Sequence, residues 1–374
     1  MPKTGSSSIQ DTLYYNLNDP EFHYIQLTDH ANAAHFIQAI FKESPESHWI
    51  FRRKGWSADK LMKLKQRFAT ELRDQLVHMA KAGKTSIISA ETIWQFKRSE
   101  LESLKTFFDD TGIQVKIIVY MRPIKSWIES AFQENVKYCI GFSDLACLGD
   151  GSILHQLDYK ERLCNFEIVF GQANLILRCF ARHSLHQACV VTDFCKNVGI
   201  DLETIQILRS NEAISADAVR LLHAYNKFAR DRDPPSLAMN HLLLMHLEEL
   251  RSVPFHMHSK MTAPIQDIIL TQNQAIVQEY GIDLNEDLCR YDALSCIQSA
   301  ANLQEFSREC LDWLAWKADC APITTTEGDV SARAVADQVA ALVRRPTMRL
   351  RWRWFRHMMR VKIHGISHRL SIAS

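Results

Sequence analysis

The stretch "IQVKIIVYMRPIKSWIES", residues 113–130, joins an almost continuous apolar run to an amphipathic segment. The apolar run is typical of a strand covered on both faces, as in a parallel sheet. Pro123 follows the run, and proline is tolerated in the first turn of a helix, so a helix should begin there. A strand that passes directly into a helix indicates an α/β fold.

The segments on either side extend this pattern. Further short strands are predicted at "TSIISAE" (85–91) and "NLILRCF" (174–180). Long amphipathic helices are predicted at 57–83 and at 98–110, the second with Ser99 as its N-cap. From about Ser215 onward the apolar spacing is helical and strand signals are almost absent. The sequence therefore predicts an α/β core over 1–212, a helical extension packed on that core over 213–320, and a linker with a basic tail over 321–374.

The charge distribution argues against a general nucleic-acid binder. Lys plus Arg number 44 and Asp plus Glu number 43, so the 374-residue chain carries no overall basic charge. The segment from Arg344 to the end holds eight Arg and one Lys with no acid, which leaves a net of −8 for the rest. The tail includes the run "WRWFRHMMR" (352–360), which packing explains more readily than binding; a basic amphipathic tail could also contact an anionic membrane.

The cysteines and the N-terminus bear on the compartment. The ten cysteines form no CxxC pair and no zinc-type spacing with histidine, and they lie in apolar segments, so reduced core thiols are expected and no metal site. The first residues lack a basic region followed by an apolar run, and no stretch of 18 apolar residues occurs. These features favour a cytoplasmic protein.

The stretch "PKTGSSSIQ", residues 2–10, has the composition of an anion-binding loop. Glycine and small hydroxyl residues at a helix start direct several backbone N–H groups one way, and the helix dipole adds partial positive charge. Lys3 adds a full charge, and Ser6, Ser7 and Ser8 can donate hydroxyl hydrogen bonds. The stretch is not a Walker A loop, because its lysine precedes the glycine, which argues against ATP or GTP hydrolysis. Taken alone, a solvated Lys3 and a serine cap explain it equally well.

Arg122 and Ser130 form the second candidate site. Arg122 ends the apolar strand, where open α/β sheets bind ligands, and its guanidinium can fork onto a phosphate. Ser130 lies eight residues further on, just over two helical turns along the predicted helix. The alternative is a surface arginine and an incidental serine.

Together the two motifs resemble those of the sulfotransferases that use 3′-phosphoadenosine 5′-phosphosulfate (PAPS), and specifically the bacterial sulfotransferase-like proteins. "PKTGSSSIQ" is similar to their 5′-phosphosulfate loop, and "RPIKSWIES" to their 3′-phosphate motif. The likeness runs less sharply through about residues 2 to 230. It implies a P-loop-like three-layer core with a central parallel sheet. It also implies that Gly5, Ser6, Ser7 and Ser8 cradle the phosphosulfate, that Lys3 stabilises the leaving phosphate, and that Arg122 and Ser130 bind the 3′-phosphate.

The resemblance implies transfer of a sulfuryl group from PAPS, without a metal, to a hydroxyl acceptor, with a carbohydrate as the expected class. Such a transfer needs a base, and Glu91, which ends the predicted strand 85–91, is the first candidate. Glu91 could equally be a first-turn acid for the helix that follows it. His23 and His30 are weaker candidates for the base.

One feature departs from the family pattern. The family loop follows a central strand, whereas here the loop stands at residue 2, so we expect either an upstream start or a missing first strand. The rival interpretation is therefore a non-catalytic sulfotransferase-like protein that binds a nucleotide or serves as a scaffold.

Overall fold

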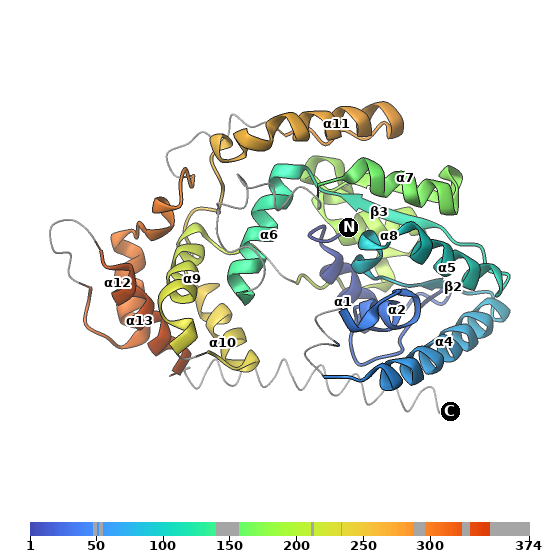
Figure 1. The fold of residues 1–374 in the computed structure, drawn as a ribbon, viewed down its shortest axis with the longest axis horizontal. Helices are drawn as coiled ribbons and strands as arrows, with labels where there is room; N and C mark the ends of the chain where they lie inside the picture. Colours follow the sequence, from blue (N-terminus) through green and yellow to red (C-terminus); the bar gives the residue numbers. More distant parts are fainter. Residues whose placement is uncertain are drawn as a thin grey trace. The chain divides into compact units, whose positions relative to one another are not determined.

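The computed structural model describes residues 1–47, 51, 55–139, 157–210, 213–232, 234–286, 296–323 and 330–344. Within them the chain forms two compact units (Figure 1). Unit 1 comprises residues 1–124, 156–212 and 270–285, and unit 2 comprises the remainder. The basic tail predicted to contact membranes lies outside the described residues, apart from its first arginine.

Unit 1 is mixed α/β and carries all four described strands. The strands are β1 (Phe22–Tyr24), β2 (Thr85–Ile87), β3 (Ile117–Met121) and β4 (Leu175–Cys179). Its α-helices are α1 (Ser6–Asn16), α2 (Ala34–Phe41), α4 (Ala58–Lys81), α5 (Arg98–Asp109), α7 (Tyr159–Phe170), α8 (Val190–Val198) and most of α11 (Gln266–Tyr280). The predicted strands at 85–91, 113–121 and 174–180 are thus confirmed in shorter form, whereas β1 was not predicted.

The strands pair in parallel as two small sheets. β1 pairs with β2, with Phe22 opposite Thr85, and β3 pairs with β4, with Ile117 opposite Leu175. The predicted parallel pairing is confirmed, but among the described residues no hydrogen-bonded ladder joins β2 to β3. The structure is therefore an α/β fold with two small parallel sheets.

One apolar core spans both sheets of unit 1. Ile87 of β2 and Tyr120 of β3 belong to the same buried cluster, which α1 and α8 cover with Ile9, Leu13 and Val191. Away from this cluster, α4 contacts α2 and β2, and α7 contacts α5 and β4. The start of α1 is thereby fixed close to the ends of strands from both sheets.

Local sequence signals explain where most helices begin and end. Ser57 caps α4 by accepting a hydrogen bond from the Lys60 amide, and Gly83 follows the end of that helix at φ 72°. For α5 the predicted cap was wrong, because Lys97, not Ser99, occupies the N-cap position. The Glu100 side chain reaches back and accepts the Lys97 amide at 2.9 Å, which is the half of a capping box that a lysine cap allows.

Unit 2 is helical in its described residues. It contains α6 (Ile124–Tyr138, from Lys125 on), α9 (Ala216–Phe228), α10 (Leu237–Leu247), α12 (Arg308–Ala318) and α13 (Ala332–Arg344). α13 packs against α9, α10 and α12, and the Val136 carbonyl of α6 accepts a hydrogen bond from the Asn226 side chain of α9. The predicted change from mixed to helical structure near Ser215 is confirmed.

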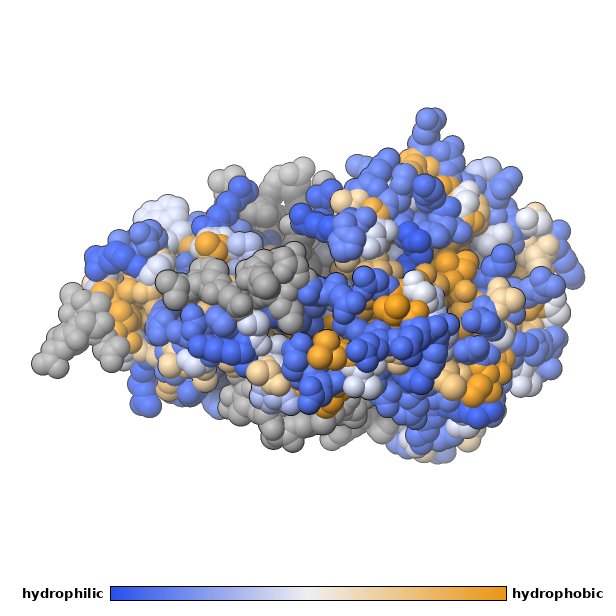
Figure 2. Space-filling view, turned by 90° about the horizontal axis from the view of Figure 1, so that it is seen from above, coloured by the Kyte–Doolittle hydropathy of each residue, from blue (hydrophilic) through white to orange (hydrophobic). Residues whose placement is uncertain are grey.

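One face of the molecule is mostly hydrophilic (Figure 2). Figure 2 shows the apolar residues of the visible face as separate patches among hydrophilic ones. Within the described part of the chain, no helix has the length and apolar content needed to cross a membrane.

The cysteines are only partly core residues. The eight described cysteines are free thiols; Cys195, Cys296 and Cys310 are buried, as expected, but Cys139 and Cys164 are exposed. Burial raises the pKa of the Cys195 thiol to about 11, so it is protonated at neutral pH.

Candidate functional site

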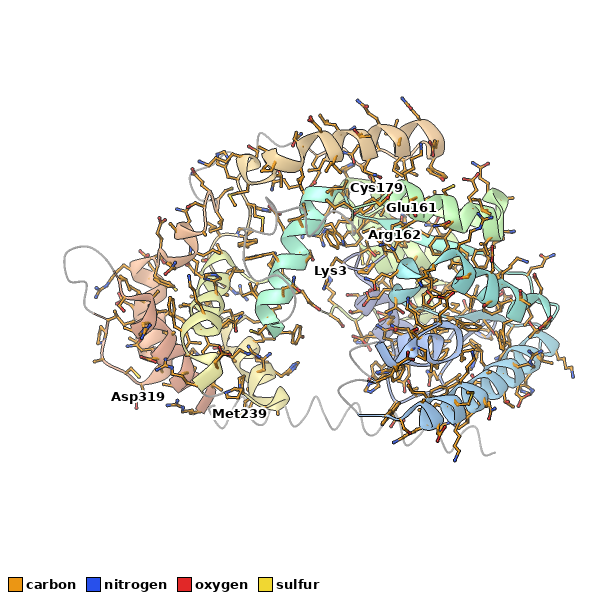
Figure 3. All side chains as sticks on the ribbon, in the orientation of Figure 1. Lys3, Glu161, Arg162, Cys179, Met239 and Asp319 are labelled. Carbon is orange, nitrogen blue, oxygen red and sulfur yellow. The ribbon has the colours of Figure 1, made fainter. Side chains whose placement is uncertain are left out.

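The predicted anion loop forms a tight turn at the start of α1. Lys3 and Gly5 both adopt left-handed backbone, at φ 66° and 72°, and the Thr4 hydroxyl closes the turn by donating to the Met1 carbonyl at 2.6 Å. Left-handed backbone is uncommon for a lysine and marks a constrained position. Figure 3 places Lys3 at the N-terminal end of α1. The loop is therefore built into the fold rather than trailing from it.

Gly5 lets the loop approach α8 closely. A Cβ added at Gly5 would lie 2.8 Å from Cγ1 of Val190 and 3.2 Å from the Phe180 ring. Gly5 also offers no side chain to cap α1, and its carbonyl accepts the amides of Ser8 and Ile9. The first-turn N–H groups of a helix have no acceptor within the helix, so this end of α1 favours an anion.

Arg122 lies beside the loop, as expected for a residue at the carboxyl end of β3. Its Nη1 donates to the Lys3 carbonyl at 2.8 Å, and its guanidinium lies 5.4 Å from the centre of the Phe180 ring. The aromatic ring and the carbonyl hold the guanidinium against the loop by a cation–π contact and a charge-assisted hydrogen bond. The structure thus brings the two sequence motifs together at Arg122.

Glu91 reaches the loop from the other sheet. It is the first residue of the short helix η2 (Glu91–Gln95), four residues past the end of β2 at Ile87, and its Oε2 accepts the Ser6 hydroxyl at 2.5 Å. The two readings of Glu91 are therefore compatible: it is a first-turn acid of η2, and its carboxylate also contacts the anion loop.

An aromatic cluster behind the site supports both Glu91 and Arg122. Trp94 of η2 is buried, stacks on Phe166 at 6.1 Å and meets Tyr159 edge-on at 5.9 Å. The Tyr159 hydroxyl donates to the Arg122 carbonyl at 3.1 Å, and Arg162 donates to the Trp94 carbonyl at 2.8 Å. One face of α7 therefore holds the backbones that carry the candidate base and the candidate phosphate ligand.

Asp193, a buried residue of α8, ties the strands behind the loop. It accepts hydrogen bonds from Tyr120 of β3 at 2.7 Å, from Arg178 of β4 at 2.7 Å and from the His186 amide at 2.9 Å. Burial alone would raise the pKa of Asp193, but Arg178, the His186 amide and Tyr120 outweigh it and lower the pKa. Asp193 was not predicted from the sequence, although a single acid in the apolar run "VVTDF" (190–194) is a visible signal.

The remaining predicted residues are placed as follows. Ser7 and Ser8 lie in the first turn of α1, half-buried. Ser130 lies half-buried on α6, in unit 2, whereas Arg122 belongs to unit 1. His23 is on β1 opposite Ser86, and His30 is exposed with its ring 5.1 Å from that of His35.

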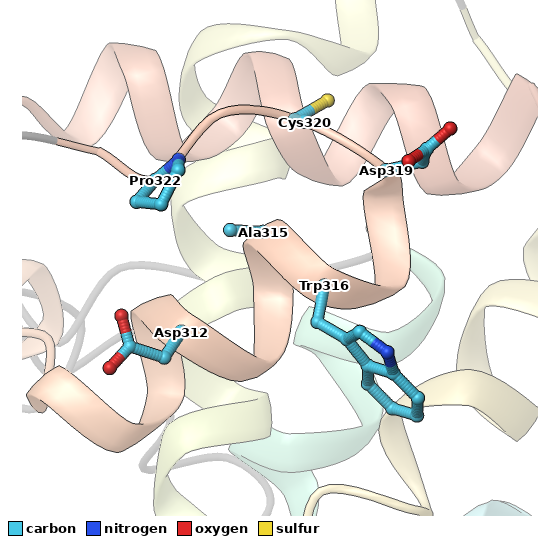
Figure 4. Close-up of a pocket in the computed structure, with 6 residues that line it drawn as sticks. All are labelled: Asp312, Ala315, Trp316, Asp319, Cys320 and Pro322. Atoms are coloured by element: carbon cyan, nitrogen blue, oxygen red, sulfur yellow. The ribbon is translucent and has the colours of Figure 1, made fainter.

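Unit 2 has a pocket of its own at the end of α12. Its lining residues are Asp312, Ala315, Trp316, Asp319, Cys320 and Pro322. Figure 4 shows that the carboxylates of Asp312 and Asp319 point away from one another, so they do not converge on one ligand atom. Among the described residues, no group of His, Cys, Asp and Glu side chains is arranged to hold a metal ion.

Comparison with known proteins leaves the family open. No family model matches the chain, and no solved structure matches it. An uncharacterized protein of Archaeoglobus fulgidus is 27% identical over 117 residues, which is 31% of this chain and 30% of that protein. The chain thus spans less than a third of the curated relative it matches, whose name carries no function.

Proposed function

We propose that the protein is a sulfotransferase that moves the sulfuryl group of PAPS to a hydroxyl group. One observation carries the proposal: the constrained loop of Lys3 and Gly5, the Arg122 guanidinium and the Glu91 carboxylate meet at the start of α1. In this proposal the loop cradles the 5′-phosphosulfate, and Arg122 binds the 3′-phosphate; the role of Ser130, in unit 2, stays a prediction from the sequence. The proposal also includes a P-loop-like three-layer core around the donor. This architecture is more specific than the α/β fold described above.

The chemistry needs little covalent participation by the protein. The acceptor oxygen forms a bond to sulfur as the bond from sulfur to the bridging phosphate oxygen breaks, and the electron pair stays on that oxygen. Lys3 offsets the charge that grows on the leaving phosphate, and the loop holds the donor in line with the acceptor. The acceptor's proton passes to Glu91.

The contact between Ser6 and Glu91 suggests how the base becomes available. The Ser6 hydroxyl has one proton, and it donates this proton in a hydrogen bond to the Glu91 carboxylate at 2.5 Å. An arriving sulfuryl or phosphate oxygen competes for that proton, so donor binding releases Oε2 of Glu91 toward the acceptor hydroxyl. Arg122 and Lys3 offset the repulsion between the donor anion and the carboxylate.

The acceptor class follows from the resemblance alone, and the compartment from the sequence. We propose a glycan acceptor and a cytoplasmic protein, without a metal and without nucleic acid as a partner. The second candidate is a non-catalytic nucleotide-binding or scaffold protein, and the same contact favours it if Ser6 keeps Glu91 occupied.

Calorimetry tests donor recognition. We expect adenosine 3′,5′-bisphosphate to bind more tightly than AMP or ATP, because the Arg122 guanidinium, held beside the loop, can pair with the 3′-phosphate. Arg122→Ala should weaken bisphosphate binding by about 1.5 to 3 kcal/mol, the range for a lost charge-assisted hydrogen bond. Arg98→Ala, which removes an exposed arginine paired with Glu102 on α5, is the control and should change nothing. Equal affinity for AMP and the bisphosphate would contradict the assignment.

A transfer assay separates the two candidates. With radiolabelled PAPS and a panel of glycan and lipid acceptors, Glu91→Gln should lower turnover by roughly 10² to 10⁴ while bisphosphate affinity stays within about twofold. Lys3→Ala should lower turnover by roughly 10² to 10³, and more than it lowers affinity. Tight bisphosphate binding without transfer to any acceptor would favour the non-catalytic candidate.

A further inference from the structure

A seven-residue segment of unit 1, which we call the strap (residues 204–210), lies along α1 and is held by its polar side chains. Asn16 donates to the Gln206 carbonyl at 2.6 Å, and Asn18, just past the helix, donates to the Thr204 carbonyl at 3.4 Å. The Thr12 hydroxyl accepts the Leu208 amide at 2.9 Å and donates to the Leu208 carbonyl at 3.3 Å. Every second residue of the strap therefore hydrogen-bonds through its backbone.

The last rung of this ladder is a residue of the anion loop. Ser8 Oγ accepts the Ser210 amide at 3.0 Å and donates to the Ser210 carbonyl at 3.3 Å. Ser8, Thr12 and Asn16 are spaced four residues apart and so share one face of α1. The Ser210 hydroxyl in turn donates to Asp11. One face of α1 thus binds the strap along its length, and the first residue of that face, Ser8, also belongs to the candidate donor site.

The Ser8 hydroxyl belongs both to the candidate donor site and to the contact with the strap. A serine hydroxyl has one proton and two acceptor positions, and the Ser210 amide occupies one acceptor position. The proton is held by a long bond of 3.3 Å, well beyond the usual 2.7 to 2.8 Å for O–H···O. An anionic oxygen that takes the proton breaks only this long bond to the Ser210 carbonyl, while the shorter bond from the Ser210 amide remains and keeps Ser8 Oγ oriented.

Apolar contacts fix the strap on its other side. Ile205 is buried and Ile207 is partly buried, and both pack on the core cluster that contains Ile9 and Leu13 of α1. The Thr12 side chain is fully buried at the middle of the ladder. Loss of the Thr12 hydroxyl would leave the Leu208 amide and carbonyl without their partner on α1.

We propose that the strap orients Ser8 as a donor to the bound anion, so that docking of the strap and binding of the donor nucleotide strengthen each other, with Thr12 as a positioning residue. This inference rests on the proposed function, in which the loop binds the phosphosulfate. Coupling of this kind is reciprocal. The bound ligand must raise the equilibrium constant for strap docking by the same factor by which the docked strap raises the affinity for the ligand.

Hydrogen exchange and calorimetry on the full chain test the coupling. In the wild type, adenosine 3′,5′-bisphosphate should slow exchange of the Leu208 and Ser210 amides. Thr12→Val should speed exchange in the strap and weaken bisphosphate binding about fivefold to tenfold, at the low end of measured coupling factors. Thr12→Ser keeps the hydroxyl and should restore both. Asn16→Ala, at a more exposed rung, should act in the same direction by about twofold to threefold and serves if Thr12→Val fails to fold.

Thr192→Val is the matched control. Thr192 is also a buried threonine of unit 1, and its hydroxyl donates to the His186 carbonyl at 2.6 Å, away from the strap. The variant should lose stability yet leave strap exchange and bisphosphate affinity unchanged. If the wild type binds bisphosphate but Thr12→Val alters strap exchange without altering affinity, the coupling is wrong and the proposed function stands. If the wild type does not bind bisphosphate, both proposals fail.

Discussion

Gly5 carries the chain through a turn that other residues resist for two separate reasons. Its φ of 72° disfavours any side chain, and an added Cβ would come within 2.8 Å of Val190. Gly83 has the same φ of 72° but nothing within 4 Å of the added atom. Gly83→Ala should therefore cost about 1 to 2 kcal/mol of stability from backbone strain alone. Gly5→Ala should cost a further 1 to 3 kcal/mol or so from overpacking.

Urea denaturation of the two variants measures this difference. Equal losses of stability would mean that α8 moves away from the loop at little cost. The donor affinity of Gly5→Ala should also fall, because any movement of α8 alters the turn that presents the loop amides, whereas Gly83→Ala should bind as the wild type does.

Helix α6 carries a buried ion pair that makes unit 2 sensitive to acid. Glu129 accepts Lys125 at 2.5 Å, the Met257 amide at 2.8 Å and His256 at 3.1 Å. Burial alone would raise the pKa of Glu129, but the bonds from His256, Lys125 and Met257 lower it overall. A lowered pKa means that this stability is complete above the unfolded value near 4.3 and is lost as pH falls through the folded pKa.

Glu129→Gln should cost about 3 to 5 kcal/mol at neutral pH, because it leaves Lys125 buried and unbalanced. As the pH falls below about 4.3, the variant should also lose less stability than the wild type does. Glu71→Gln breaks an exposed pair with Arg67 on α4 and should cost at most about 0.5 kcal/mol, with an unchanged pH profile. Parallel pH profiles for wild type and Glu129→Gln would show that another group controls acid unfolding.

At the scale of the molecule, Lys3, Glu91 and Arg122 all belong to unit 1. A ligand that binds only the folded state should stabilise unit 1 by about 2.7 kcal/mol at one hundred times its Kd. Residue-resolved hydrogen exchange with bisphosphate should therefore show greater protection in α1 and α8 than in α9 and α13. Arg122→Ala at the same ligand concentration should lose most of the gain. Equal protection of all four helices would indicate that the two units unfold as one.

The sequence predicted the helices and strands better than it predicted which strands pair with one another. Strand β3, the helix after Pro123 and the start of α9 follow from local spacing and caps, which act within a few residues. β1 was missed because a strand of three residues leaves no periodic signal. The single sheet was expected from the family pattern, but strand pairing depends on residues far apart in the sequence, and the structure has two ladders.

The site shows the same division. The residue types at positions 3 to 8 and the end of β3 were sufficient to select Lys3, Gly5 and Arg122 from sequence. Asp193 and Ser210 were missed, because their roles depend on side chains and backbone groups that approach from more than 70 residues away.

The interleaving of the two units has a consequence for synthesis. The chain leaves unit 1 after residue 124, returns at 156, leaves again after 212 and returns for residues 270–285. The last segment of unit 1 ends some 277 residues after the loop at residues 3 to 8, so it is made after a delay. At 5 to 20 residues per second that delay is roughly 15 to 60 s. During this interval the earlier segments of unit 1 lack residues 270–285, so unit 1 completes its packing only when this last segment has been made.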